Sequence, residues 1–370
     1  MHTCLVLGAG ATLANALYFH KSRMAGHNPP LDYTFFEKVL ALGIPIPAEL
    51  KTYADAMPGS SPFIAEVGRP ALRMEEFFKE LFSDFQEANP GSAIALAYEE
   101  LVALYTRVLR ETTDWIGADG KTGGPVGRLI SAAADASDRL SIVTFNHDLV
   151  IENEIVKRKR LRKRWCIEQG YGGYSKVLVF TKPSSGLLFP PHDALCDHTN
   201  PIEVLKLHGS LNWYVRMLGS HPSRSILTGS TTSARVHCTA RRNVPHQLRS
   251  TRPVTRTKGR ASWYTWPVII PPVHNKEALI RNFVAQVWTD AATAVSTADV
   301  LIFVGYSLPM LDTGAERLFR RGVASNAKLR SVDVVNPSPT SAARYASIMT
   351  PKGVRWAYNI DSFLQATPFS

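Results

Sequence analysis

The chain has 370 residues and carries 42 Lys and Arg against 31 Asp and Glu, which gives a net charge of +11 at neutral pH. This length allows one large α/β domain with insertions, or two ordinary domains. Apolar residues make up 45% of the chain and charged residues 20%, so a packed core is feasible and wholesale disorder is excluded.

The positive charge is concentrated in two segments. Residues 157–164 read KRKRLRKR and hold seven cations, and residues 216–262 hold ten Lys or Arg with no Asp or Glu. Together they exceed the net charge of the whole chain, so the remainder is mildly acidic. Segments of this kind bind nucleic acid or an acidic partner, and a solvated helix surface is the alternative for residues 157–164.

The cysteines and the apolar runs narrow the class of protein further. The four cysteines, at positions 4, 166, 196 and 238, form no CxxC pair, which excludes a zinc site built from two such pairs and argues against a disulfide framework. The apolar N-terminus lacks a basic leader and predicts a core strand rather than a signal peptide. Because no run of about 18 apolar residues occurs, we expect no membrane span and a cytoplasmic location.

The predicted elements alternate along the chain. Short apolar runs predict buried strands at residues 4–7, 140–144, 177–180, 203–207, 268–270, 300–304 and 332–335. Amphipathic stretches predict helices at residues 74–85, 92–109, 126–136, 279–295 and 314–323. Apolar strands that alternate with helices are typical of a doubly wound α/β fold, whose parallel sheet is covered on both faces.

Two stretches do not fit this alternation. Residues 12–139 are too many for a single crossover between strands, so we expect residues 30–115 to form a mainly helical insertion. Residues 216–262 are rich in Ser, Thr, Arg and Pro and predict a long surface loop or a partly disordered, basic insertion. Residues 1–370 then form a single α/β domain with two insertions.

Glycines and polar residues follow five of the predicted strands. The strand ends read GAGAT at residues 8–12, TFNHD at 144–148, HGS at 208–210, GYSLP at 305–309 and NPSP at 336–339. Ligands bind beyond the carboxyl ends of the strands in open parallel sheets, so we expect these residues at one edge of one sheet. The sequence therefore predicts a single ligand site at this edge.

The glycine pair also has a purely structural interpretation. Gly8 and Gly10 begin a dinucleotide fingerprint whose third glycine position is occupied by Leu13. As a ligand loop, the pair would let a pyrophosphate approach the backbone and the N-terminus of the next helix. The alternative is a turn needed only to pass from strand to helix.

The polar side chains have similar alternatives. Asn146 and Asp148 could be turn or capping residues, and Asp312 could cap the helix that starts at residue 313. His208 could be a core histidine with satisfied hydrogen bonds. The combination of all five strand ends favours the functional interpretation.

Several segments, taken in chain order, resemble the Sir2 family, and specifically the bacterial Sir2-like proteins of anti-phage defence. They are GAGAT (8–12), PPLDYTFF (29–36), TFNHD (144–148), LHGSLNW (207–213) and VGYSLPMLD (304–312). The resemblance implies a Rossmann-like domain that binds NAD as its substrate, with Asn146 and His208 acting on the nicotinamide ribose. It implies that the strand-end loops bind the dinucleotide through Gly8, Ala9, Gly10, Thr12, Asp148, Gly305, Ser307 and Asn336.

The chain departs from the protein-deacetylating sirtuins in two places. It lacks their four-cysteine zinc ribbon and their GIPDFR segment after the glycine loop. We therefore expect no zinc. The ribbon helps to form the groove for the acetyl-lysine peptide, so its absence argues against deacetylation. Water is then the nucleophile, and the resemblance implies hydrolysis of NAD to nicotinamide and ADP-ribose.

The residue types suit this chemistry. Cleavage of the nicotinamide–ribose bond builds positive charge on the sugar, and the leaving pyridine needs no proton. An amide such as Asn146 can orient water and the ribose hydroxyls, and a histidine such as His208 can accept a proton near neutral pH.

The resulting hypothesis is an NAD hydrolase that depletes cellular NAD in anti-phage defence by abortive infection. The resemblance implies a homo-oligomer and a partner such as a HerA-type ATPase or an Argonaute, and Lys157–Arg164 and Arg216–Arg260 are candidate contacts for nucleic acid. The alternative from another class is a non-catalytic sensor of NAD or ADP-ribose that uses these basic segments. A protein deacylase is the third hypothesis.

Overall fold

The structure is a computed structural model. It describes residues 1–19, 28–57, 73–116, 123–167, 169–176, 178–181, 201–218, 235–241, 244–245, 263–271, 276–309, 312–349 and 353–366.

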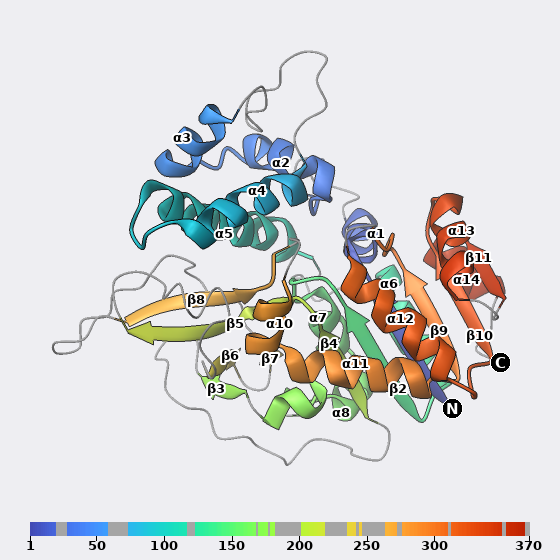
Figure 1. Ribbon diagram of the computed structural model, residues 1–370. Helices are drawn as coiled ribbons and strands as arrows, with labels where there is room; N and C mark the ends of the chain where they lie inside the picture. Colours follow the sequence, from blue (N-terminus) through green and yellow to red (C-terminus); the bar gives the residue numbers. More distant parts are fainter. Residues whose placement is uncertain are drawn as a thin grey trace.

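A six-stranded parallel sheet forms the centre of the molecule (Figure 1). Its strands are β1 (His2–Leu7), β2 (Arg139–Thr144), β4 (Ile202–Lys206), β9 (Val300–Val304), β10 (Ser331–Val335) and β11 (Val354–Ala357). They lie in the order β11-β10-β9-β1-β2-β4, and every neighbouring pair is parallel. The predicted fold class, a Rossmann-like α/β sheet, is confirmed.

This strand order locates a ligand crevice. Counted along the chain, the six strands of this sheet lie in the order 3-2-1-4-5-6, which is the dinucleotide-binding arrangement of doubly wound sheets. The direction of winding reverses between β1 and β9, and ligands of such sheets bind where it reverses, beyond the carboxyl ends of the strands. The loops after β1 and β9 therefore form the first place to look for a site.

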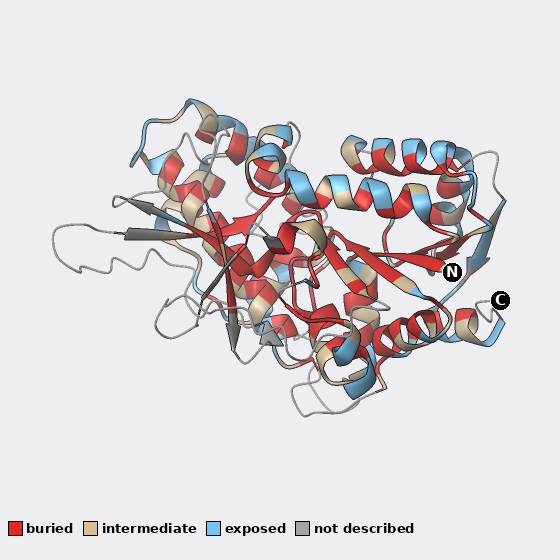
Figure 2. Ribbon diagram, turned by 90° about the horizontal axis from the view of Figure 1, so that it is seen from below, coloured by how far each residue is buried: buried red, intermediate tan, exposed pale blue. Residues whose placement is uncertain are grey.

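Helices cover both faces of the sheet, as Figure 2 shows in the view from below, where the buried residues lie on the inner sides of the helices. On one face, α11 (Ala285–Thr297) contacts β1, β2 and β4 and packs against α12 (Thr313–Ser325). On the other, α6 (Pro125–Asp135) contacts β2 and packs against α1 (Ala9–Phe19), α7 (Val150–Val156) and α14 (Ile360–Ala366). Helix α13 (Pro339–Ile348) contacts β10 and β11.

The described elements between residues 30 and 115 are all helical. They are a 3-10 turn, η2 (Asp32–Thr34), and the helices α2 (Phe35–Ala41), α3 (Ala48–Ala56), α4 (Met74–Glu87) and α5 (Ala93–Thr113). Phe36 and Phe77 meet edge to face, with ring centroids 5.5 Å apart, and Phe78 and Tyr105 do the same at 5.5 Å. These buried side chains belong to the same apolar core as the parallel sheet, so the helical region packs with the sheet around one core.

The structure has a second sheet of five strands, four of which lie in the order β3-β6-β5-β8. Its strands are β3 (Val179–Thr181), β5 (Gly209–Leu218), β6 (Val236–Arg241) and β8 (Trp263–Ile269), and the two-residue strand β7 (Val244–Pro245) pairs with β6. β5 runs antiparallel to β6 and β8. The predicted strands at residues 177–180 and 268–270 thus lie in this second sheet and not in the parallel one, which corrects the sequence analysis.

The expectation of a loop over residues 216–262 is wrong for residues 216–218 and 244–245, which belong to β5 and β7, and for residues 236–241. Residues 236–241 form β6, in which Val236 and Cys238 are buried. Two apolar positions with a polar one between them make a weak strand signal in so polar a segment. Residues 219–234, 242–243 and 246–262 lie outside the described part of the chain.

Two other predictions change. The helix predicted over residues 279–295 divides at Val284 (φ −135°) into α10 (Glu277–Phe283) and α11. Cys166 is disulfide-bonded, although Cys4 and Cys238 are free and buried. Of the helices in the described residues, none is long and apolar enough to span a membrane.

Candidate functional site

The loop after β1 lies against the loop after β9. The amide of Gly8 donates to the carbonyl of Val304 at 3.0 Å, and the amide of Gly10 donates to the carbonyl of Gly305 at 2.9 Å. A Cβ at Gly8 would lie 2.6 Å from the Gly305 oxygen, and a Cβ at Gly305 (φ +60°) would lie 2.3 Å from the amide nitrogen of Ala11. These glycines are therefore required for the close approach of two backbones, whatever ligand binds there.

The amide of Asn146 joins the end of β2 to this loop. Its Nδ2 donates to the carbonyl of Gly8 and to the hydroxyl of Thr12, each at 2.9 Å. The Thr12 hydroxyl in turn donates to Oδ2 of Asp148 at 2.9 Å. Three predicted site residues, Asn146, Thr12 and Asp148, thus form one buried network around Gly8.

Asp148 also has the local role that the sequence analysis left open. Its Oδ1 accepts a hydrogen bond at 2.9 Å from the amide of Val150, the first residue of α7. Asp148 therefore shapes the entry to α7 with one oxygen and holds Thr12 with the other.

His208 follows β4 and lies in a second polar cluster. Its Nε2 is 3.1 Å from Nζ of Lys276, and the same Nζ donates to Oδ1 of Asp312 at 3.0 Å. The hydroxyl of Tyr306 donates to the other oxygen of Asp312 at 2.9 Å. We call these four residues, His208, Lys276, Asp312 and Tyr306, the His208 cluster; all four are buried.

Asp312 has two functions in this arrangement. Its Oδ1 accepts from the amide of Ala315 at 3.4 Å, so it caps α12, as the structural alternative predicted. It also carries the hydrogen bonds from Lys276 and Tyr306, which a mere cap would not need.

Burial keeps the site histidines neutral. Desolvation, followed by the charge of Lys276 and by His147, lowers the pKa of His208 well below 6.5. Desolvation and the charge of Lys206 lower the pKa of His147 to about 3. The two imidazoles lie with ring centroids 6.1 Å apart and an interplanar angle of 30°. Both rings are therefore uncharged at neutral pH, which is the form that can accept a proton.

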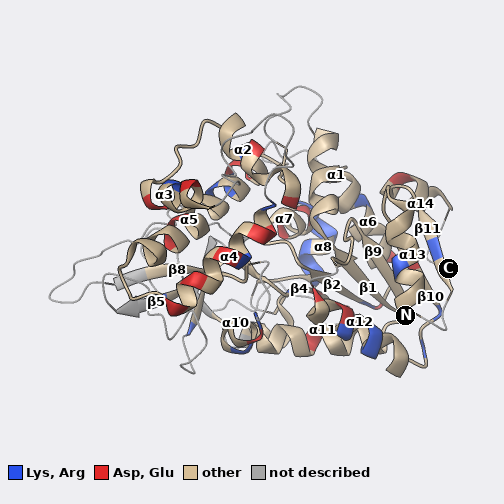
Figure 3. Cartoon of the chain, turned by 45° about the horizontal axis from the view of Figure 1, so that its top comes forward, with Lys and Arg blue, Asp and Glu red and all other residues tan. Residues whose placement is uncertain are grey.

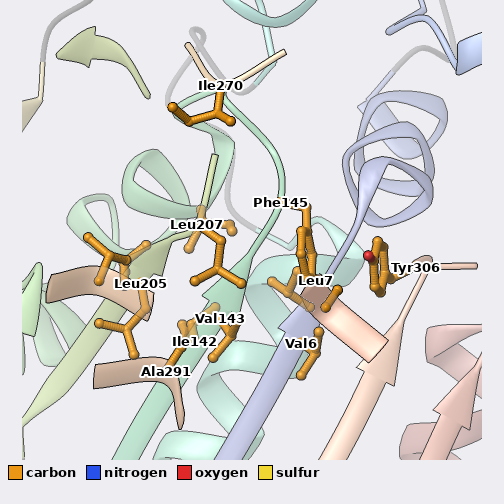
Figure 4. Packing of buried hydrophobic residues seen from close by; sticks show 14 of the residues in the cluster. Val6, Leu7, Ile142, Val143, Phe145, Leu205, Leu207, Ile270, Ala291 and Tyr306 are labelled. Atoms are coloured by element: carbon orange, nitrogen blue, oxygen red, sulfur yellow. The ribbon is translucent and has the colours of Figure 1, made fainter. Parts of the chain in front are cut away.

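Aromatic rings connect the strand ends (Figure 4). The rings of Phe145 and Tyr306 stack with centroids 4.1 Å apart and an interplanar angle of 7°. Phe145 also meets the ring of His208 edge to face at 5.2 Å. The residues after β2, β4 and β9 thus pack into one unit, which fixes the orientation of the imidazole.

The helical region supplies acidic groups to the same edge. The amide of Glu75, in the first turn of α4, donates to Oδ1 of Asp32 at 2.8 Å. Desolvation and the nearby charge of Asp32 raise the pKa of Glu75 to about 7, and the charges of Lys276 and Asp312 also act on it. Tyr105 of α5 also meets the ring of His147 edge to face at 5.6 Å, so the helical region lies against this edge of the sheet.

A fully buried ion pair lies behind Asp148. Nζ of Lys206 is 3.1 Å from Oε1 of Glu152, and both side chains have 0% exposure. Lys206 also donates to the carbonyl of Asp148, and Tyr171 donates to Oε1 of Glu152 at 3.2 Å. Desolvation raises the pKa of Glu152. Through the hydrogen bond from Lys206 to the carbonyl of Asp148, this pair fixes the backbone of the TFNHD segment.

The side chains of two predicted residues, Ser307 and Asn336, form no hydrogen bond to either network within the described residues. The side chain of Ser307 is exposed. Oδ1 of Asn336 accepts from the amide of Ser338 at 2.9 Å, which shapes the turn after β10. Ala9 begins α1 and is exposed beside Gly10.

Sequence reasoning did not single out Lys276, Tyr306, Glu75 or Lys206. Tyr306 and Lys206 had visible signals, because one lies inside the GYS segment and the other is a charge at the end of an apolar strand. Lys276 and Glu75 had none, since each reaches the site from the start of a helix with no motif around it. Across the described residues, no group of three His, Cys, Asp or Glu side chains could hold a metal ion.

The first basic segment is largely engaged in contacts within the molecule; Figure 3 shows its helix, α8 (Lys159–Arg164). Arg158 pairs with Glu154 at 2.5 Å, and Arg160 pairs with Asp135 at 2.6 Å. Arg164 donates to backbone carbonyls that include Ser137, at 3.0 Å. Three further cations, Lys159, Arg162 and Lys163, are exposed. Most of the second basic segment lies outside the described residues.

The comparisons with known proteins give structural likeness only. No protein-family model matches the chain, and no curated protein matches it. Among solved structures, Sir2Tm bound to a propionylated peptide is 12% identical with a TM-score of 0.43, and the match covers 98% of this chain and 90% of that one. A Sir2 homologue in complex with NAD is 12% identical with a TM-score of 0.40, and the match covers 100% and 88%. Likeness at this level does not establish a family or an activity. The fold and the site themselves define a doubly wound α/β protein with a buried His-Lys-Asp cluster at the ligand-binding edge.

Proposed function

We propose that this protein hydrolyses NAD to nicotinamide and ADP-ribose. The observation that carries the proposal is the position of Gly8, Asn146 and His208 after β1, β2 and β4, at one edge of a sheet whose strand order is that of dinucleotide-binding folds. The glycine loop and the N-terminus of α1 suit the pyrophosphate.

The hydrogen bonds of Asn146 fix how its amide can act. Because the carbonyl of Gly8 can only accept, the amide nitrogen must face it, and both Nδ2 hydrogens are donated. Oδ1 accepts no hydrogen bond from the described residues. This oxygen is the atom that would accept a hydrogen bond from the attacking water or from a ribose hydroxyl.

His208 would act as the proton acceptor. Its pKa is lowered by burial and by Lys276, so the ring is neutral over the physiological range. General-base catalysis of this kind is typically worth about 10²–10⁴-fold in rate. As the sugar gains positive charge, the imidazole would take the proton released by water or by a ribose hydroxyl.

Incubation of the purified protein with NAD, with and without an acetylated peptide, tests the proposal. We expect nicotinamide and free ADP-ribose, formed without peptide. Release that depends on the peptide, with transfer of the acyl group, would instead favour the deacylase. Binding of NAD with no turnover under any condition would favour the sensor.

We propose the cellular role on the sequence resemblance alone. In that role the enzyme depletes NAD during phage infection, as a homo-oligomer or together with a partner such as a HerA-type ATPase or an Argonaute. Cells that carry the wild-type chain or the His208→Ala variant, compared after infection, test this role. Loss of cellular NAD with the wild type alone is expected, and equal NAD levels in both would contradict it.

A further inference from the structure

The hydrogen bond between Lys276 and His208 determines which ring nitrogen of His208 carries the hydrogen. A lysine ammonium has three donors and no acceptor. Nε2 of His208, 3.1 Å from Nζ of Lys276, must therefore be the accepting nitrogen, and the ring hydrogen lies on Nδ1. Asp312 holds the ammonium in this position at 3.0 Å.

This arrangement prevents His208 from accepting a proton. The lone pair of Nε2 is taken by Lys276, and Nδ1 presents a hydrogen instead of a lone pair. Protonation of the imidazole beside the ammonium would also place two positive charges 3.1 Å apart in a buried site. As long as Lys276 occupies Nε2, His208 accepts no proton, so wild-type turnover comes only from molecules in which this contact is broken.

Lys276 also lies at the edge of a groove between α10, α11 and α12. The groove has a volume of about 700 Å³, which is typical of small-molecule sites. Arg281, Arg317 and Arg321 line the same groove and are exposed, and among the described residues they form no ion pair. The single acidic residue of the lining is Glu277, so the groove has an excess of positive charge.

The composition of the groove indicates the chemistry of its ligand. Arginine side chains bind phosphate through two parallel hydrogen bonds, and Arg317 and Arg321 lie one helical turn apart on α12. Trp288, Ile280 and Leu318 give the groove an apolar wall. The indole of Trp288 also donates to the carbonyl of Leu207 at 2.9 Å, directly before His208.

We propose that Lys276 restrains the site by occupying Nε2 of His208, and that a small phosphate-bearing ligand in the groove releases it. The bound phosphate would give the ammonium an alternative partner and free the lone pair of His208. The effect on catalysis rests on the proposed NAD hydrolysis. The hydrogen bond and the ligand site do not, and they can be tested separately.

The first test removes the ammonium. Lys276→Met is compared with wild type by ¹⁵N NMR of histidine-labelled protein, with the His208 signal assigned from His208→Gln. We expect the ring hydrogen to leave Nδ1, and nicotinamide release to rise about tenfold or more, within the range of general-base catalysis. Lys51→Gln, an exposed lysine on α3, is the matched control and should leave both unchanged.

The outcomes of this test are distinct. An unchanged His208 tautomer, or a fall in release to the level of His208→Ala, overturns the restraint. A changed tautomer with no nicotinamide release from any form of the protein supports the contact and contradicts the proposed function. If Lys276→Met does not fold, the tautomer of His208 in the wild-type protein decides, since hydrogen on Nε2 overturns the proposal.

The second test uses inorganic pyrophosphate as the probe. Titration should shift the His208 signal in wild type, and the double variant Arg317→Gln/Arg321→Gln should bind at least about tenfold more weakly, as lost charge-assisted hydrogen bonds predict. Arg320→Gln is the matched control, because Arg320 lies on the same helix but pairs with Glu316 at 2.8 Å. No response in wild type, or equal weakening in both variants, overturns the ligand site.

Discussion

The amide of Gly10 donates a hydrogen bond of 2.9 Å to the carbonyl of Gly305, which joins the loop after β1 to the loop after β9. These are the two strands between which the sheet reverses its winding. The contact leaves no room for a side chain at Gly8, Gly10 or Gly305. It therefore couples the stability of the fold to the shape of the ligand crevice.

Two glycines with the same φ angle distinguish the cost of backbone strain from the cost of steric overlap of an added Cβ. Gly43 and Gly305 both have φ of +60°, but a Cβ at Gly43 meets nothing within 4 Å, whereas one at Gly305 lies 2.3 Å from a backbone nitrogen. We expect Gly43→Ala to lower the free energy of unfolding by about 1 kcal/mol and Gly305→Ala to lower it by about 1–3 kcal/mol more. Urea unfolding measures both, and equal losses would contradict the tight packing at Gly305.

For the buried ion pair of Lys206 and Glu152, we expect that removing one partner costs more stability than replacing both. Lys206→Met leaves the Glu152 carboxyl buried without its cationic partner, so we expect a loss of about 3–5 kcal/mol in the free energy of unfolding. The double variant Lys206→Met/Glu152→Leu should lose clearly less, because no charge is left uncompensated. Urea unfolding of both variants measures the difference.

Arg320→Met, which breaks the exposed pair with Glu316, is the control for that comparison and should lose about 1 kcal/mol or less. A double variant that is no more stable than Lys206→Met would contradict the buried pair as the source of the cost.

His147 predicts a loss of stability in acid. Its pKa is about 3 in the folded protein and about 6.5 in the unfolded chain. Between these values the unfolded chain binds a proton that the folded protein refuses, so this contribution to stability falls as the pH drops from 6.5 toward 3. The slope is about 1.4 kcal/mol per pH unit for one such group.

The test compares wild type with His147→Gln, which cannot titrate in this range, by urea unfolding at pH 7 and pH 5. The groups that do not interact with His147 titrate alike in both proteins, so the difference reports on His147 and on its neighbour His208. We expect the wild type to lose more stability than the variant between these pH values. Parallel losses would show that His147 is not held neutral by the fold.

The parallel sheet could be predicted because its strands are continuous apolar runs. β1, β2, β4, β9 and β10 all appear within two residues of their predicted positions. β11 could not be predicted in this way, because its residues, VRWA, are intermediate or exposed at the sheet edge. The second sheet could not be assigned because its strands pair across long, polar segments of the chain.

The site was predictable only where residues follow strands. Asn146 and His208 lie at the ends of β2 and β4, and topology alone brings them to one edge. Lys276 is the residue before α10, and its contact with His208 depends on how that helix packs. The sequence indicates that Asp312 is a candidate helix cap, but its position next to Lys276 depends on the tertiary fold.

The release of nicotinamide from NAD by paired histidine and asparagine variants tests the central claim most directly. His237→Ala is the matched control, since that histidine lies in β6 against Tyr214 and belongs to neither polar network. We predict that His208→Ala and Asn146→Ala each abolish release, with a loss of at least about 10²-fold for the histidine, while both variants unfold as cooperatively as wild type. Release that survives in His208→Ala and Asn146→Ala at the level of His237→Ala would contradict the assignment of this site as the one that hydrolyses NAD.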